Sequence, residues 1–164
     1  MRHLSILWAL LVVLTPLTAH AQSKLAKPDA VWAAGIGGGN LISGFSIKKM
    51  LTKETAVQGV LGSSVYGMFG VAGGADYMVS QPELWRGDGA RLRWGVGAGA
   101  AVVMHQSGSW VDASAVIELV LRFDEIPLEL VSDYRPGYIL WMGSSGAFGG
   151  LHLGTGGGAV RWYF

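Results

Sequence analysis

His105 and Ser107 are the residues of this chain whose types and spacing come nearest to catalytic chemistry. One position separates the imidazole from the hydroxyl, and the carboxylates of Asp112 and Glu118 follow in the same predicted hairpin. A Ser activated by a His that a carboxylate orients is the arrangement of nucleophilic acyl transfer. The Gln-Ser-Gly-Ser sequence around Ser107 is also typical of a turn. We therefore expect no enzyme, and keep a hydrolase that uses His105 and Ser107 as an alternative.

Cofactor and metal motifs are weak in this sequence. The chain has no Cys and 4 His, which excludes Cys-based zinc sites and disulfide frameworks. Residues 154–159 fit the G-x-G-x-x-A spacing of dinucleotide-binding loops, but such a loop leads into a helix, and a terminal strand is expected here. The 12 basic and 11 acidic residues nearly cancel, so nothing indicates a nucleic-acid partner. No catalytic residue, no cofactor-binding residue and no metal ligand is predicted.

The composition indicates one exported, apolar domain. Of 164 residues, 51% are hydrophobic, 26 are Gly and only 14% are charged, whereas soluble domains carry about a quarter charged residues. Arg2 precedes the apolar run Ile6–Leu14, and Ala19-His20-Ala21 has the form that signal peptidase cleaves. We predict a signal peptide over residues 1–21 and a single domain over residues 22–164.

Period-2 alternation predicts strands throughout this domain. From Arg91 to Met104 the residues at even positions are all apolar, and those at odd positions are charged or small, so the two parities form two faces. No apolar run of the domain is long enough for a transmembrane helix, so the structure left for crossing lipid is a closed barrel. The predicted fold is all-β, an eight-stranded antiparallel up-and-down transmembrane β-barrel. The predicted strands are Val31–Gly38, Ile42–Leu51, Thr55–Ser63, Phe69–Ser80, Arg91–His105, Val111–Asp124, Ile126–Tyr138 and Leu151–Phe164.

The predicted links differ in length. Most are short turns, and the two longest are the loops Ser80–Ala90, on the side of the termini, and Ile139–Gly150, on the opposite side. Aromatic residues near the strand ends are expected to form two belts at the membrane interfaces. The belt residues are Tyr77, Trp94, Phe123, Trp162 and Phe164 at one end, and Tyr66, Phe69, Trp110, Tyr138 and Trp141 at the other.

Parity also places nine charged residues inside the predicted barrel. A Lys or Arg on the lipid face near the midplane would cost about 2–4 kcal/mol, and eight strands leave an interior just wide enough for side chains. We predict a lumen filled by paired charges, with a narrow ion path through them as the alternative. The nine residues are Lys48, Asp76, Arg93, Glu118, Arg122, Glu129, Asp133, Arg135 and Arg161.

The chain ends on one apolar parity that carries Gly158, Val160, Trp162 and the terminal Phe164. Here the sequence resembles the small eight-stranded, OmpA-type barrels of the Gram-negative outer membrane. The resemblance implies an outer-membrane location and a terminal assembly signal at Trp162 and Phe164. It also implies contact with outer-membrane lipid, lipopolysaccharide and the barrel-assembly machinery, a monomer, and no particular activity. Two barrel enzymes of similar size, the lipid A deacylase and the lipid A palmitoyltransferase, use a His with a Ser and an acidic residue. The deacylase carries its His-x-Ser in a different part of its chain.

Overall fold

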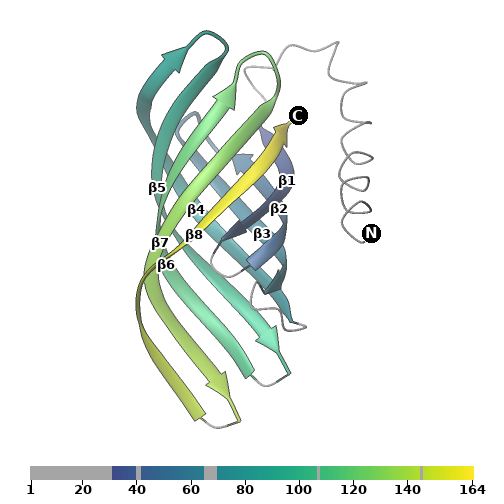
Figure 1. Ribbon diagram of the computed structural model, residues 1–164, viewed down its shortest axis with the longest axis vertical. Helices are drawn as coiled ribbons and strands as arrows, with labels where there is room; N and C mark the ends of the chain where they lie inside the picture. Colours follow the sequence, from purple (N-terminus) through teal and green to yellow (C-terminus); the bar gives the residue numbers. More distant parts are fainter. Residues whose placement is uncertain (1–30, 40–41, 65–69, 107, 145) are drawn as a thin grey trace, which may run out of the picture.

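Eight antiparallel strands form a closed barrel. The computed structural model describes residues 31–39, 42–64, 70–106, 108–144 and 146–164. Each strand pairs with the next along the chain, and β8 closes the ring on β1 (Figure 1). The strands are β1 Trp32–Gly39, β2 Ile42–Met50, β3 Thr55–Ser64, β4 Val71–Gly87, β5 Ala90–His105, β6 Gly108–Phe123, β7 Leu128–Gly143 and β8 Gly146–Tyr163. The predicted all-β, up-and-down architecture is confirmed.

Parts of the prediction lie outside the described residues: the signal peptide over residues 1–21, the hydroxyl of Ser107, and the belt positions Tyr66 and Phe69. Within the described ranges no helix is long and apolar enough to cross a membrane.

The two ends of the barrel are distinct. At the terminal end β1 begins, β8 ends, and the links 51–54, 88–89 and 124–127 connect neighbouring strands. At the far end β1, β3, β5 and β7 end, and β2, β4, β6 and β8 begin. Since the strand number is even, the first and last strands start and finish at the same end.

The wall of the barrel is uneven in height. Strands β1 to β3 have 8 to 10 residues, whereas β4 to β8 have 16 to 18. The strands are also staggered. Tracing cross-strand partners from Gly37 on β1 through β2 to β7 leads to Phe148 on β8, but the direct β8 partner of Gly37 is Ala159. As a result the β4–β5 hairpin projects at the terminal end and the β7–β8 hairpin at the far end (Figure 1).

Both predicted long loops are wrong. The Ser80–Ala90 loop is strand up to Gly87, and the Ile139–Gly150 loop is the paired ends of β7 and β8. In β4, register shifts between Ser80 and Trp85 interrupt the alternation from which strands are predicted. The start of β8 is rich in Gly, so it has no alternation to read.

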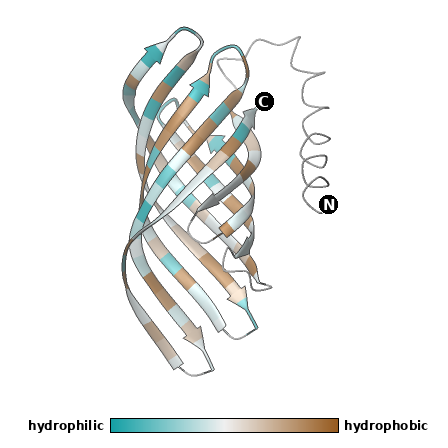
Figure 2. Ribbon diagram, in the orientation of Figure 1, coloured by the Kyte–Doolittle hydropathy of each residue, from teal (hydrophilic) through white to brown (hydrophobic). Residues whose placement is uncertain are grey.

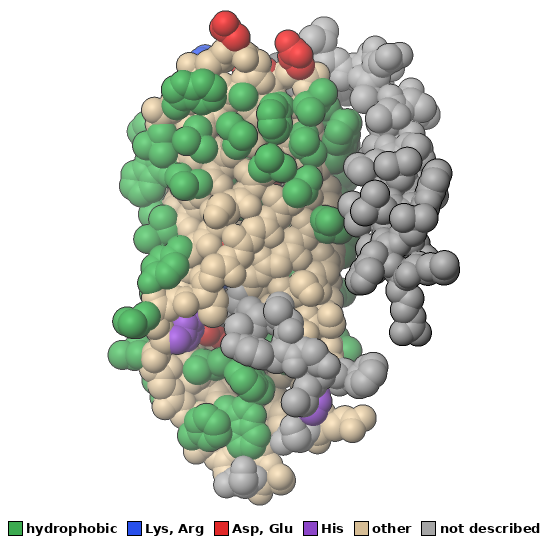
Figure 3. All heavy atoms as spheres, viewed as in Figure 1, with side chains coloured by type: hydrophobic (Ala, Val, Ile, Leu, Met, Phe, Trp, Pro, Cys, Tyr) green, Lys and Arg blue, Asp and Glu red, His purple; other side chains and the backbone are tan. Residues whose placement is uncertain are grey.

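Side chains alternate between an apolar outer wall and the lumen. Along β6, Ile117 and Leu119 are each 46% exposed, whereas the alternate residues Val116 and Glu118 are each 1% exposed. Hydrophobic and hydrophilic residues alternate along the strands in Figure 2. On the face seen in Figure 3, hydrophobic side chains gather below the terminal end, and acidic side chains stand at its rim. The outer wall is therefore apolar, as the parity predicted.

The far half of the lumen holds an apolar cluster. Ile42, Ala72, Ala101 and Val103 are buried together, and Trp110 packs against them. The rest of the lumen is mostly polar, apart from a smaller buried cluster of Val120, Val131 and Ala159. Small residues make room there for the polar side chains. A Cβ at Gly99 would lie 1.9 Å from the carboxylate oxygen Oδ1 of Asp76.

Candidate functional site

The carboxylate of Glu129 is the hub of the polar lumen near the terminal end. Arg161 donates to Glu129 Oε1 at 2.9 Å, and the Tyr163 hydroxyl donates to Oε2 at 2.6 Å. Lys48 Nζ donates to the same Oε2 at 3.5 Å. Arg161 also donates through Nε to the Ser46 hydroxyl at 2.8 Å. Strands β2, β7 and β8 are joined by these bonds in the interior of the barrel.

Gln58 continues the network across the lumen. Its amide nitrogen donates to Glu118 Oε2 at 3.3 Å and to Asp76 Oδ2 at 3.2 Å. Lys48 Nζ lies 4.0 Å from Glu118 Oε1, so the lysine connects Glu118 with Glu129. One uncharged amide therefore bridges two carboxylates on β4 and β6.

Arg135 forms the far edge of the network. Its two terminal nitrogens donate to the two oxygens of Asp76 at 2.8 and 2.9 Å. Its Nε donates to Asp133 Oδ1 at 2.7 Å. A bidentate Arg–carboxylate pair fixes both partners more firmly than a single bond does.

We call these connected residues the lumen network. They come from β2, β3, β4, β6, β7 and β8, so only β1 and β5 contribute no member. Burying an ion costs several kcal/mol, which only well-formed pairs and hydrogen bonds offset. The lumen network consists of Ser46, Lys48, Gln58, Asp76, Glu118, Glu129, Asp133, Arg135, Arg161 and Tyr163.

The structure brings seven of the nine charged residues singled out in the sequence into this network. The other two differ: the Arg122 guanidinium lies 4.0 Å from the ring centroid of Tyr163, and Nε of Arg93 is buried with no hydrogen-bond partner. Sequence reasoning missed Ser46, Gln58 and Tyr163 because only charges were sought. The available signal was their position on the inward face of their strands. Ser46 shares that face of β2 with Lys48, and Tyr163 shares that face of β8 with Arg161.

The lumen network and the apolar cluster meet at a small void. A cavity of about 20 Å³ is lined by Asp76 and Arg135 on one side and by Ile42 and Ala101 on the other. Such a volume suits about one water molecule. The two sets of side chains thus fill this part of the lumen.

The carboxylates considered for catalysis have other contacts. Asp112 Oδ2 lies 2.6 Å from Nε2 of His152, the other His of the barrel domain. Glu118 belongs to the lumen network. In the residues that the structure describes, no group of three or more His, Asp or Glu side chains could hold a metal ion.

Two aromatic residues of the predicted far belt face the interior instead. Trp110 packs against the apolar cluster, and Trp141 lies directly across the ladder from it. Trp141 stacks on Phe148 with 5.0 Å between ring centroids. The belt prediction is wrong for Trp110 and Trp141 because residue type was weighed above parity: Trp110 shares its face with the inward Asp112.

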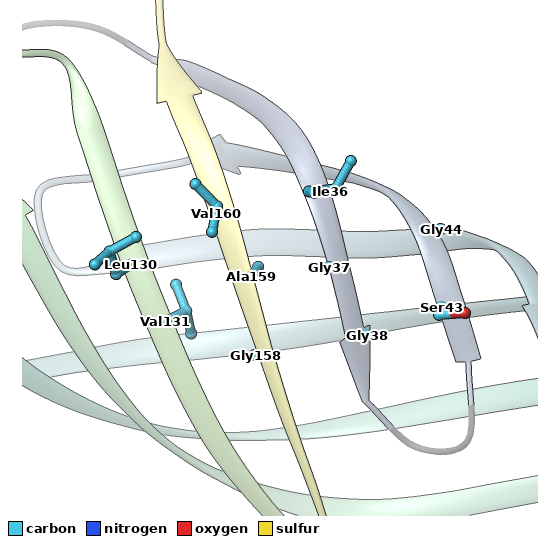
Figure 4. A pocket seen from close by; sticks show the side chains of 10 residues that line it. All are labelled: Ile36, Gly37, Gly38, Ser43, Gly44, Leu130, Val131, Gly158, Ala159 and Val160. Atoms are coloured by element: carbon cyan, nitrogen blue, oxygen red, sulfur yellow. The ribbon is translucent and has the colours of Figure 1, made fainter. Parts of the chain in front are cut away.

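The outer wall carries a shallow hollow. It has a volume of about 690 Å³, and outward Gly38 and Gly158 form its floor between Ile36, Leu130 and Val160 (Figure 4). No charged side chain lines it. The hollow therefore offers apolar contact and no reactive group.

Comparisons with protein-family models, with curated proteins and with solved structures find no match for this chain.

Proposed function

We propose that this chain is a small outer-membrane β-barrel of Gram-negative type, with a structural or loop-mediated binding role and no catalysis. The apolar wall around a charged interior is the observation that carries this proposal. Large side chains such as Ile36, Phe45 and Leu61 are exposed outside, while Lys48 and Glu129 are buried inside. In water, each Å² of apolar surface left exposed would forgo about 25 cal/mol of hydrophobic stabilisation. Lipid around the wall removes that cost.

Strand length supports the same environment. Strands β1 to β3, with 8 to 10 residues, approach the 9–11 tilted residues that span a bilayer. Under the proposal, residues 1–21 direct export, and Trp162 and Phe164 present the assembly signal to the barrel-assembly machinery. Phe164 suits this role, since its side chain is exposed and its backbone N–H donates to the Trp32 carbonyl at 3.0 Å. Outer-membrane lipid and lipopolysaccharide would surround a monomer.

Side chains that fill the lumen favour a barrel that does not conduct ions over the alternative of a narrow ion channel. An ion would have to separate the Arg135–Asp76 pair and then pass Ile42 and Val103. Each separated, buried charge costs several kcal/mol. We infer that the barrel does not conduct at rest.

Two measurements test the proposal. The expressed chain should be found in the outer-membrane fraction and migrate faster on gels before boiling than after it. Planar bilayers containing the refolded protein should stay silent. Recovery as a soluble periplasmic protein would overturn the membrane assignment, and steady unitary conductance would overturn the closed lumen.

A further inference from the structure

The projecting part of β8 has an open edge. β1 pairs with β8 only from Gly158 to Tyr163, whereas β7 pairs with β8 along almost its whole length. From Gly146 to His152 the ladder with β7 is regular. In the described part of the chain no strand pairs with this stretch from the other side. Its outward N–H and C=O groups form a template for another strand.

A second open edge, on β4, is protected. The β3–β4 ladder ends where Thr55 pairs with Val79, so Gln81–Gly87 projects without a β3 partner. This stretch contains Pro82, Glu83 and Arg86, and two register shifts. Proline, charge and bulges are the devices by which proteins prevent strand addition.

The β8 edge contains no proline and no Lys, Arg, Asp or Glu. Residues 146–157 read GAFGGLHLGTGG, and Leu151 and Leu153 are 88% and 92% exposed. The single irregularity of the β7–β8 ladder, between Arg135 and Gly137, lies beyond His152 and leaves the tip regular. One barrel thus protects one edge and leaves the other open.

We propose that the β8 edge, residues 146–152, binds an extended segment of another protein as an added strand. Main-chain hydrogen bonds would hold the segment, and the absence of Lys, Arg, Asp and Glu from the edge favours a neutral, apolar one. The inference rests on the proposed function for its setting: at the far end β8 extends past the end of β1, so residues 146–152 lie at the rim of the barrel.

Membrane geometry argues against a second copy of the chain as the occupant. Two barrels that share one orientation are related by an axis along the membrane normal. Strands tilted by about 35–45° then cross between the copies at roughly twice that angle instead of aligning. A segment free to choose its direction meets no such restriction.

The test uses the full chain refolded in detergent and a labelled synthetic peptide with the sequence of Gly137–Gly143. That segment already pairs with residues 146–152 from the other side. We expect saturable binding by fluorescence anisotropy and slower amide exchange in residues 146–152. The double variant Leu151→Lys, Leu153→Lys should weaken binding at least tenfold, and a peptide with Leu140→Pro should not bind.

Leu84→Lys on the protected β4 edge is the matched control and should leave peptide affinity unchanged. No binding by the wild type, or equal loss with Leu84→Lys, would overturn the proposal. Dimerisation that the β8 double variant abolishes would identify a second copy as the occupant and also overturn it. Gel migration before and after boiling, run on each sample, reports the folded barrel separately.

Discussion

The two halves of the lumen solve the same packing problem with opposite chemistry. The lumen network fills its part with charges and hydrogen bonds drawn from six strands, whereas the apolar cluster fills the far part with Ile42, Ala72, Ala101 and Val103. A missing partner in the network leaves a buried ion, while a missing methyl group in the cluster leaves only a void. The network should therefore tolerate less change than the cluster.

Glu129→Ala should have the largest effect. It removes the acceptor shared by Lys48, Arg161 and Tyr163, and breaking a buried pair costs about 3–5 kcal/mol. Urea unfolding of the refolded barrel, followed by tryptophan fluorescence, measures the loss. Glu125→Ala, at an exposed turn position, is the control and should change the free energy of unfolding by less than about 0.5 kcal/mol. Equal stabilities for the two variants would show that the network contributes nothing.

Ile42→Ala should cost less, about 3 kcal/mol, in the lower half of the range of about 2–5 kcal/mol for a buried Ile. Its side chain is fully buried in the apolar cluster. The same urea titration measures the change, with exposed Ile36→Ala on the outer wall as control. Planar bilayers should stay silent for this variant, because the network still fills its part of the lumen. Conductance in Ile42→Ala alone would instead make the cluster the seal of the barrel.

The sequence predicts which residues enter the lumen, but not which of them meet there. Alternation predicts which face of β6 enters the lumen, since parity is a local property. It does not predict that Lys48 meets Glu129, 81 positions away, because that contact depends on the stagger of the closed ring. The tip of β8 was missed for the opposite reason: glycines erase the local pattern, and only pairing with β7 makes it a strand.

Gly99→Ala should have an intermediate effect of about 2 kcal/mol, typical of overpacking. The added methyl group would meet Asp76 Oδ1 and push that carboxylate away from Arg135. Unfolding in urea again gives the number. Gly150→Ala is the control, because a Cβ there meets nothing within 4 Å. If both changes are neutral, the carboxylate of Asp76 has room to move, and the network is less rigid than its hydrogen bonds indicate.

Arg86→Ala should have the smallest effect. Arg86 pairs with Glu83 at 3.0 Å, a distance as short as several in the lumen, but its side chain is 61% exposed. Exposed pairs contribute about 0–1 kcal/mol because water screens them, so the urea midpoint should barely move. A loss comparable to that of Glu129→Ala would mean that distance, and not burial, sets the contribution of these pairs to stability.

If burial decides, Arg86 matters for another reason: without its charge the β4 edge loses protection against strand addition. Light scattering at high protein concentration should then detect association of Arg86→Ala that the wild type lacks.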